Sequence, residues 1–524
     1  MLANGKEPSG AVPKIRRACD CCRARKTRCD SHNPCENCQR AKSRCIYRVA
    51  EKKGPKRRRL QEAATADAGQ TATNHQEQEN IYVNDTSVQQ LPQGNSISCF
   101  ETSSLLSVVI IRSCLDAFFN GKSTIMPILD RRDIFARLHH LRDSPERYGL
   151  ITALCSVIVA QRDILSPFPA FKTLEDSLKC GSQSPVEFLI SETHRARSFC
   201  NYVENPSLDS LQTSFFLFAV FFCLGKDNSA WFYLRESITM LQLLNLHEDT
   251  TYATMADSQY AIYCRRTFWL LFITERAYAL QRHRPLTLMP SICLPTFDLA
   301  EATILPGFLD LVTLFQKFDN KFISFWNRPS LSPLSVQPVV QLQQFLKDAI
   351  PKVSERTEIQ QADLLISRQW LKTIVWQLCV SRRLLSSNTT VEAMSFHFPV
   401  VIAREVILIL RLLPFQAFQT HGVGIMEKIF DIGCSLADVL LAHPNVLQAS
   451  TFEIGPKDYL MEFVRILDMG IIGSSKYVRL LAARADECLG VRMRGNLYLS
   501  NGDADSHSIG EIDWEDNAEN EDIM

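Results

Sequence analysis

Apolar residues recur at spacings of three and four along most of the chain, which is the periodicity of an amphipathic helix. The segment 229–246 shows the pattern clearly, because one helix face collects Trp231, Leu234, Ile238, Leu241 and Leu244. Similar apolar stripes occupy 103–119, 147–160, 207–224, 258–281, 305–326, 360–385, 398–413, 426–442 and 458–484. Alternating strand patterns are scarce, and prolines fall between the stripes, where helices end. The pattern predicts a large all-α domain over 99–495.

Several segments lack this periodicity and divide the chain. Residues 1–13 are expected to be a disordered tail, and 14–50 form a cysteine-rich unit. Residues 51–98 are predicted to be a basic and polar linker, whose few large apolar groups cannot offset the entropy of ordering. Residues 496–524 are an acidic tail. The expected organisation is a small N-terminal domain, a disordered linker, a large helical domain and the tail.

Charge is distributed unevenly along the chain. Apolar residues make up 46% and charged residues 22%, which suits a mostly folded protein, and the formal net charge is zero. Residues 14–59 nevertheless hold 17 Lys or Arg against Asp20, Asp30, Glu36 and Glu51, so this segment carries +13 and the remainder carries −13. A strongly basic end on an otherwise acidic chain indicates a polyanionic partner.

Cysteines cluster in the same basic segment. Of the 18 cysteines, seven lie between Cys19 and Cys45, and the other eleven are scattered singly. No apolar signal segment is visible at the N-terminus, so we expect the thiols to stay reduced and the clustered cysteines to bind metal. The most apolar run, Phe215 to Leu224, has ten residues where a bilayer needs about 20, so no membrane partner is expected.

Six of the clustered cysteines repeat one spacing. The order is C-x2-C-x6-C-x5-C-x2-C-x6-C, and the candidate metal ligands are Cys19, Cys22, Cys29, Cys35, Cys38 and Cys45. Each half of the repeat can place a ligand pair at the start of a short helix and return a third ligand after it. Six thiolates cannot build two separate tetrahedral sites, which need eight ligands, but they suffice for two Zn2+ if two thiolates bridge both metals. Such a cluster has a formal charge of about −2, which the surrounding cations offset.

This spacing and its basic filling resemble the fungal Zn2Cys6 family. The match is carried by ACDCCRARKTRCD at 18–30 and PCENC at 34–38. The resemblance implies a small, irregular binuclear cluster domain with two short helices, in which Cys19 and Cys35 bridge the metals. One Zn2+ would then be bound by Cys19, Cys22, Cys29 and Cys35, and the other by Cys19, Cys35, Cys38 and Cys45.

Two further residues in the segment are alternative ligands. Cys21 stands where the family usually has another residue type, and replacing Cys22 by Cys21 would break the symmetry of the repeat. We therefore expect Cys21 to be a bystander. His32 is the only histidine of the segment, and a different zinc module such as a RING would need eight ligands, usually with a histidine among them. We expect no ligand role for His32.

The cations between the cysteines suit duplex DNA. A short helix over 23–28 can enter the major groove, where Arg and Lys are the donors suited to guanine O6 and N7. By resemblance, Arg25 and Lys26 align with positions that reach base edges, Lys26 above all, and the family typically binds CGG-type sites. Phosphate contacts, which give affinity without sequence preference, are assigned to Arg17, Arg23, Arg28, Arg40, Lys42 and Arg44. The alternative is that these cations only solubilise and neutralise the cluster.

The ends of the chain suggest further partners. A basic run suits nuclear import, hence an import receptor and a nuclear location, or backbone clamping; it comprises Lys52, Lys53, Lys56, Arg57, Arg58 and Arg59. Residues 501–524 mix nine carboxylates with Trp514 and aliphatic residues, which fits an activation segment that folds on a coactivator. A solvated linker and a merely solubilising tail are the alternatives. Residues 60–98 show no sustained heptad repeat, so a monomer and a homodimer through the helical domain both remain open.

Part of the helical region, 229–296, resembles the regulatory middle homology domain of the same family. The resemblance is carried by Trp231, Leu234-Arg235-Glu236, Leu243-Leu244-Asn245-Leu246-His247, Arg265-Arg266, Trp269, Arg284-Pro285 and Leu294-Pro295. Glu275 stands where the family usually has Asp. We interpret these as helix-packing residues of a regulatory domain. No HExxH, GxSxG or GxGxxG context appears, and Gly121-Lys122-Ser123 lacks the upstream glycine of a P-loop, so no enzyme is expected.

Together these features predict a zinc-dependent, sequence-specific DNA-binding transcription factor acting on RNA polymerase II genes, expected to be an activator. The preferred target is a fungal secondary-metabolite biosynthetic gene cluster, and the alternative is a set of sugar or other catabolic genes. A zinc-dependent scaffold or RNA-binding protein is the alternative of another class.

Overall fold

The chain forms two compact units, Met1–Gly94 and Asn95–Met524. The computed structural model describes residues 18–32, 34–42, 45, 100–161, 174–176, 178, 183–297, 299–328, 335–386, 391–442, 454–469 and 475–489. Every regular element within these residues is a helix. The prediction of a small cluster domain followed by a large all-α domain is therefore confirmed.

The first unit contains two short helices, α1 (Asp20–Ala24) and α2 (Glu36–Arg40). Each has five residues, and the side chains that they bury are cysteines, Cys22 in α1 and Cys38 in α2. So small a unit has almost no apolar core, and the sulfur atoms must organise it instead.

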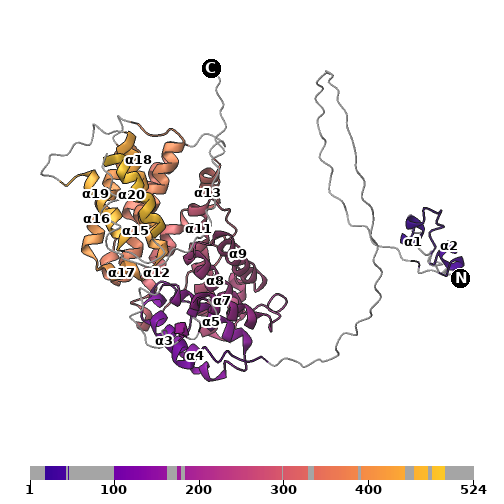
Figure 1. The fold of residues 1–524 in the computed structure, drawn as a ribbon. Coiled ribbons are helices and arrows are strands. Elements are labelled where there is room, and N and C mark those ends of the chain that lie inside the picture. Colours follow the sequence, from indigo (N-terminus) through magenta and orange to yellow (C-terminus); the bar gives the residue numbers. More distant parts are fainter. Residues whose placement is uncertain are drawn as a thin grey trace, which may run out of the picture. The chain divides into compact units, whose positions relative to one another are not determined.

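The first group of helices in the second unit begins with α3 and ends with α11 (Figure 1). Its members are α3 (Val108–Asn120), α4 (Arg131–Ala136), α5 (Pro145–Val159), α7 (Pro185–Arg197), α8 (Leu208–Cys223), α9 (Asp227–Leu243), α10 (Asp249–Thr254) and α11 (Ser258–Arg282). Helix α5 packs against α3, α7 and α8, and α8 also packs against α9. Because α5 is covered on several sides, it is buried over nearly its whole length, from Tyr148 to Val159.

The second group surrounds the 24-residue helix α15 and is drawn in pink to yellow in Figure 1. Its members are α12 (Leu305–Gln316), α13 (Asn320–Asn327), α14 (Val336–Asp348), α15 (Glu358–Ser381), α16 (Phe398–Leu412), α17 (Phe415–Gln419), α18 (Val423–Ala442), α19 (Pro456–Asp468) and α20 (Ser475–Leu489). Helix α15 contacts α12, α14, α16, α17 and α18, and α18 in turn contacts α19 and α20. Helix α12 contacts both α11 and α15, so it joins the two groups.

Two predicted stripes differ from the helices observed. The stripe 305–326 is divided into α12 and α13, because the Asp319 carboxylate accepts the Phe322 N–H at 2.8 Å and caps a new helix. The stripe 458–484 covers parts of both α19 and α20, and residues 470–474 between those helices lie outside the described part. Helix α7 was not predicted, although Ser184, Pro185 and Glu187 form its capping box with proline at the first turn.

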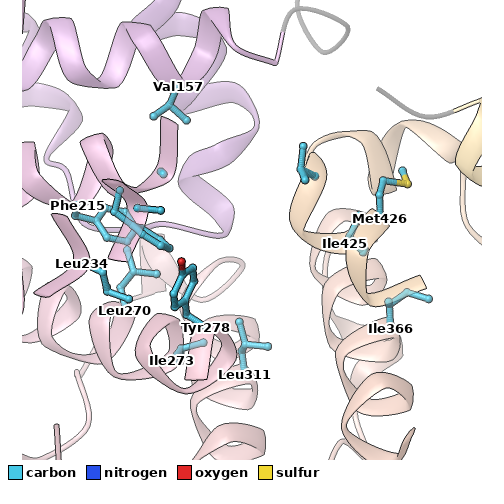
Figure 2. Packing of buried hydrophobic residues seen from close by; sticks show 14 of the residues in the cluster. Val157, Phe215, Leu234, Leu270, Ile273, Tyr278, Leu311, Ile366, Ile425 and Met426 are labelled. Carbon is cyan, nitrogen blue, oxygen red and sulfur yellow. The ribbon is translucent and has the colours of Figure 1, made fainter. Parts of the chain in front are cut away.

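One hydrophobic cluster extends through both helical groups. Figure 2 shows Phe215, Leu270 and Tyr278 on one side of its centre, with Ile366 and Ile425 on the other. The tryptophans Trp269 and Trp370 are among its largest fully buried side chains. The core thus depends on contacts between helices that are far apart in the sequence.

Candidate metal centre and nucleic-acid interface

Cysteine side chains start both helices of the first unit. The Cys19 sulfur accepts the Cys22 N–H at 3.4 Å, and the Cys35 sulfur accepts the Cys38 N–H at 3.4 Å. Both capping residues have extended backbones, as an N-cap requires. The sulfur thus occupies the place that a serine or aspartate oxygen usually fills. The internal repeat of the sequence is therefore also a structural repeat.

The six predicted ligands lie together in two overlapping groups of four. Within each group the sulfur atoms lie within 4.8 Å of one another, and the groups share Cys19 and Cys35. Their members are Cys19, Cys22, Cys29 and Cys35 in one, and Cys19, Cys35, Cys38 and Cys45 in the other. Neither group includes Cys21 or His32.

The sulfur–sulfur distances suit zinc. The Cys19 and Cys35 sulfurs are 3.7 Å apart, and the Cys22–Cys35 and Cys19–Cys38 pairs are each 3.5 Å apart. Tetrahedral zinc with Zn–S bonds of about 2.3 Å places its sulfur ligands roughly 3.75 Å from one another. Residues of the right number, chemistry and spacing are therefore present for a two-zinc, six-thiolate centre.

Burial and hydrogen bonding act differently on the two thiols of the first half. The N–H of Cys22 stabilises the Cys19 thiolate and lowers the pKa of Cys19 to about 6. Burial, together with neighbouring thiols, raises the pKa of Cys22 to about 12. A bound metal ion deprotonates a coordinating thiol outright. Metal binding would therefore release protons chiefly from thiols such as Cys22.

Polar contacts connect the two halves of the repeat. The Asp30 carboxylate accepts the Glu36 N–H at 2.9 Å, which lowers the pKa of Asp30, and it also accepts the His32 N–H at 3.2 Å. The Asn37 side chain donates to the Arg28 carbonyl at 2.6 Å. This connecting role was not predicted from the sequence. Its partners are mostly backbone groups, which every residue offers, so the sequence carries no specific signal for it.

The cationic side chains of the predicted DNA contacts point to solvent. Residues 23–28, including Arg25 and Lys26, are all exposed, as are Arg40 and Lys42. Lys26 follows α1 with φ +52°, and Lys42 follows α2 with φ +47°. Each donates its N–H to a carbonyl three residues back at 3.2 Å, so the two lysines occupy equivalent turns in the two halves. Predicted contacts Arg17 and Arg44, and the import run 52–59, lie outside the described residues.

Comparison with known proteins agrees with this geometry. Residues 17–54 match the fungal Zn(2)-Cys(6) binuclear cluster domain, and residues 115–298 match the fungal specific transcription factor domain. The chain is a fungal Zn(2)-Cys(6) transcription factor. This family binds DNA through a cluster of two zinc ions, so the predicted family and metal are confirmed.

Relatives of this transcription factor match it over most of their length. A "Probable sucrose utilization protein" of Candida albicans is 28% identical over 80% of this chain and 78% of its own. A "Maltose fermentation regulatory protein" of Saccharomyces cerevisiae is 22% identical over 84% of this chain and 87% of its own. A "Respiratory transcription factor" of the same yeast is 22% identical over 82% and 86% respectively. These names match the catabolic alternative and give no support to the preferred biosynthetic-cluster prediction.

The residues that resemble the middle homology block form polar anchors around α11. The buried Glu275 carboxylate accepts the Arg235 guanidinium at 3.0 Å, which ties α11 to α9. The Trp269 indole donates to the Cys293 carbonyl at 3.0 Å and holds the segment after α11 against that helix. These contacts fit the interpretation as packing residues.

Among the helices of the described residues, none is long and apolar enough to cross a membrane.

Proposed function

We propose that the factor holds two Zn2+ in its first unit, with 14–50 as the folded domain. Cys19 and Cys35 would bridge the metals, and the sites would be completed by Cys22 and Cys29 on one side and by Cys38 and Cys45 on the other. The observation that supports this assignment is the sharing of Cys19 and Cys35 between the two sulfur groups. Cys21 is proposed as a bystander.

We further propose that α1 and the turn after it contact base edges of CGG-type sites in duplex DNA. Arg25 and Lys26 are exposed at the end of this helix, where guanidinium and ammonium donors can reach guanine O6 and N7. The phosphate contacts are proposed for Arg17, Arg23, Arg28, Arg40, Lys42 and Arg44, because they are positively charged and lie beside the ligand cysteines in the sequence.

The structural repeat supplies a matched pair of variants to test base contact. Lys26→Ala should weaken binding to the CGG duplex by about 1–3 kcal/mol and binding to a scrambled duplex only slightly. The preference for the CGG duplex over the scrambled one should therefore decrease. Lys42→Ala, at the equivalent turn, should weaken binding to both duplexes alike. It should also lower the salt dependence of the affinity by about one phosphate contact. Band shifts at several salt concentrations measure both effects. Equal losses on the two duplexes for Lys26→Ala would make Lys26 a phosphate contact instead.

We propose that the target genes serve sugar utilisation rather than a biosynthetic cluster. The supporting observation is that the sucrose and maltose relatives align over more than three quarters of both chains, beyond the DNA-binding segment. Transcript profiles of a deletion strain on sucrose, maltose and glucose test this. Induction of sugar-hydrolase and transporter genes should be lost. Unchanged sugar transcripts together with a silenced biosynthetic cluster would reverse the assignment.

The remaining partners are proposals that extend this function. A nuclear location through an import receptor rests on the basic run 52–59, and activation of RNA polymerase II genes through a coactivator rests on the acidic tail 496–524. The helical domain, placed at 99–495, is proposed as the regulatory part. A homodimer through this domain is open, and sedimentation of the full chain with and without DNA distinguishes it from a monomer.

A further inference from the structure

A cavity of 180 Å3 lies between the two helical groups. One wall is aromatic and comes from α8 and α11, with Phe215, Phe218 and Tyr278, and the opposite wall comes from α18, with Ile425. Figure 2 shows Phe215 and Tyr278 on one side and Ile425 on the other. The volume is below the roughly 300–1,000 Å3 of sites for drug-sized ligands, so the space suits a small metabolite.

A buried cation without a carboxylate partner lies in the cavity lining. The Lys122 side chain is 2% exposed, and its Nζ donates to the Thr420 carbonyl at 2.9 Å. An ammonium group has three donors, so this bond leaves others available. Among the described residues, no carboxylate is within 4.0 Å of Lys122 Nζ. Burial lowers the pKa of Lys122 to about 8, and the group therefore still carries its charge at neutral pH.

The carboxylate that lines the same cavity is engaged by other groups. Asp363 accepts Lys428 Nζ at 3.2 Å and the Ser367 hydroxyl at 2.9 Å, and His421 Nδ1 lies 3.9 Å from it. Burial lowers the pKa of His421, so at neutral pH the ring adds no charge. The lining therefore combines two ammonium groups with one carboxylate. The excess positive charge sits at Lys122.

A second polar group in the lining also lacks a partner. Gln161 is 5% exposed, its amide nitrogen donates to the Cys223 sulfur at 3.0 Å, and its amide oxygen has no hydrogen bond. If the amide were rotated, the nitrogen would instead be left without a full set of partners. Gly422 leaves room for this side chain, because a Cβ there would lie 2.7 Å from the Gln161 amide carbon. A buried polar atom without a hydrogen-bond partner destabilises the folded state, and a ligand that supplied the partner would remove this cost.

We propose that this cavity binds a small anionic metabolite, whose carboxylate or phosphate pairs with Lys122. A hydroxyl of its body would donate to the Gln161 amide oxygen, and the body would lie against Phe215, Phe218 and Tyr278. Such a ligand would contact both helical groups at once and would stabilise the arrangement in which they face each other. Binding would thus report metabolic state to the transcription factor. This role rests on the proposed function, but the binding itself does not.

Thermal unfolding of the full zinc-loaded chain tests the site. The probes are glucose 6-phosphate for a phosphate, gluconate for a carboxylate, and glucose and maltose as neutral controls. At about a hundredfold excess over Kd, a true anionic ligand should raise the melting temperature by roughly 2–4 °C. A shift with one anion and not the other identifies the anionic group.

Two variants separate this site from the basic N-terminal segment, which also attracts anions. Lys122→Met should abolish the anion-induced shift and raise the melting temperature of the ligand-free chain, because a buried unpaired charge is removed. Lys352→Met should keep the shift, because the Lys352 side chain is 69% exposed and does not line the cavity. Three results would overturn the proposal. They are equal shifts of the melting temperature in both variants, a shift with the neutral sugars alone, and no shift with either anion. None of these results depends on which genes the factor controls.

Discussion

Glu275 is the carboxylate that ties the segment after α11 to the rest of the helical unit, and we predict that Glu275→Ala destabilises this unit strongly. The side chain is fully buried. It accepts the backbone N–H groups of Thr287 at 2.8 Å and Leu288 at 2.9 Å, as well as the Arg235 guanidinium at 3.0 Å. The Thr287 hydroxyl donates to it as well, so one residue satisfies four donors from two other parts of the chain.

The expected size of the loss follows from these partners. Alanine leaves the Leu288 N–H buried without an acceptor, and each such group costs about 1–3 kcal/mol. Removing one member of a buried ion pair costs about 3–5 kcal/mol, but the Arg235 side chain is 29% exposed and can be rehydrated, so the lower end applies. We expect a total loss of about 4–6 kcal/mol in the free energy of unfolding. Glu275→Gln keeps one acceptor oxygen and should lose about 1–2 kcal/mol.

Denaturant unfolding of the full chain, followed by tryptophan fluorescence, measures this loss. All six tryptophans lie beyond residue 230, so the signal does not come from the zinc unit. The control is Glu248→Ala. The Glu248 carboxylate is 56% exposed, so its replacement should change the free energy of unfolding by less than about 0.5 kcal/mol. Equal stabilities for Glu275→Ala and the control would refute the role given to this carboxylate.

Three other predictions concern the zinc centre, a buried acid and the tail. Cys35→Ala should abolish zinc binding while Cys21→Ser keeps both ions, as measured by native mass spectrometry; zinc loss in Cys21→Ser would contradict the ligand assignment. Burial raises the pKa of Asp431 to about 7, so stability should fall as pH rises from about 4 to about 7. Asp431→Asn keeps an acceptor for the Trp370 indole, which donates at 2.9 Å, and should flatten this dependence in urea titrations. Deleting 501–524 should lower reporter transcription without changing DNA affinity, and unchanged transcription would leave the tail a solubilising role.

Much of the helical unit could be predicted from periodicity alone. The stripes 258–281 and 398–413 correspond closely to α11 (Ser258–Arg282) and α16 (Phe398–Leu412). Helix α7, which was missed, and helix α13, which was merged with α12, begin at side-chain caps rather than at a change in apolar spacing. The division at Asp319 is an example, because one hydrogen bond from a side chain starts a new helix within a continuous apolar stripe.

The metal centre was predictable because ligand spacing is a property of the sequence itself. The cavity was not, because its lining comes from helices far apart along the chain. Lys122 illustrates the limit, since a single lysine in a sequence is normally exposed and nothing in Gly121-Lys122-Ser123 indicates burial. Lys122 begins the short 3-10 helix Lys122–Thr124, and it is buried because the fold brings the distant Thr420 carbonyl to its Nζ.

We propose that two zinc ions, which share the Cys19 and Cys35 thiolates, organise the first unit so that one cationic helix end can recognise DNA. The most direct measurement is the zinc content of the purified full chain together with its binding to CGG and scrambled duplexes, before and after chelation. We predict two zinc ions per chain and a CGG preference that disappears when the metal is removed. Fewer than two ions per chain, or a preference that persists without metal, would contradict the claim.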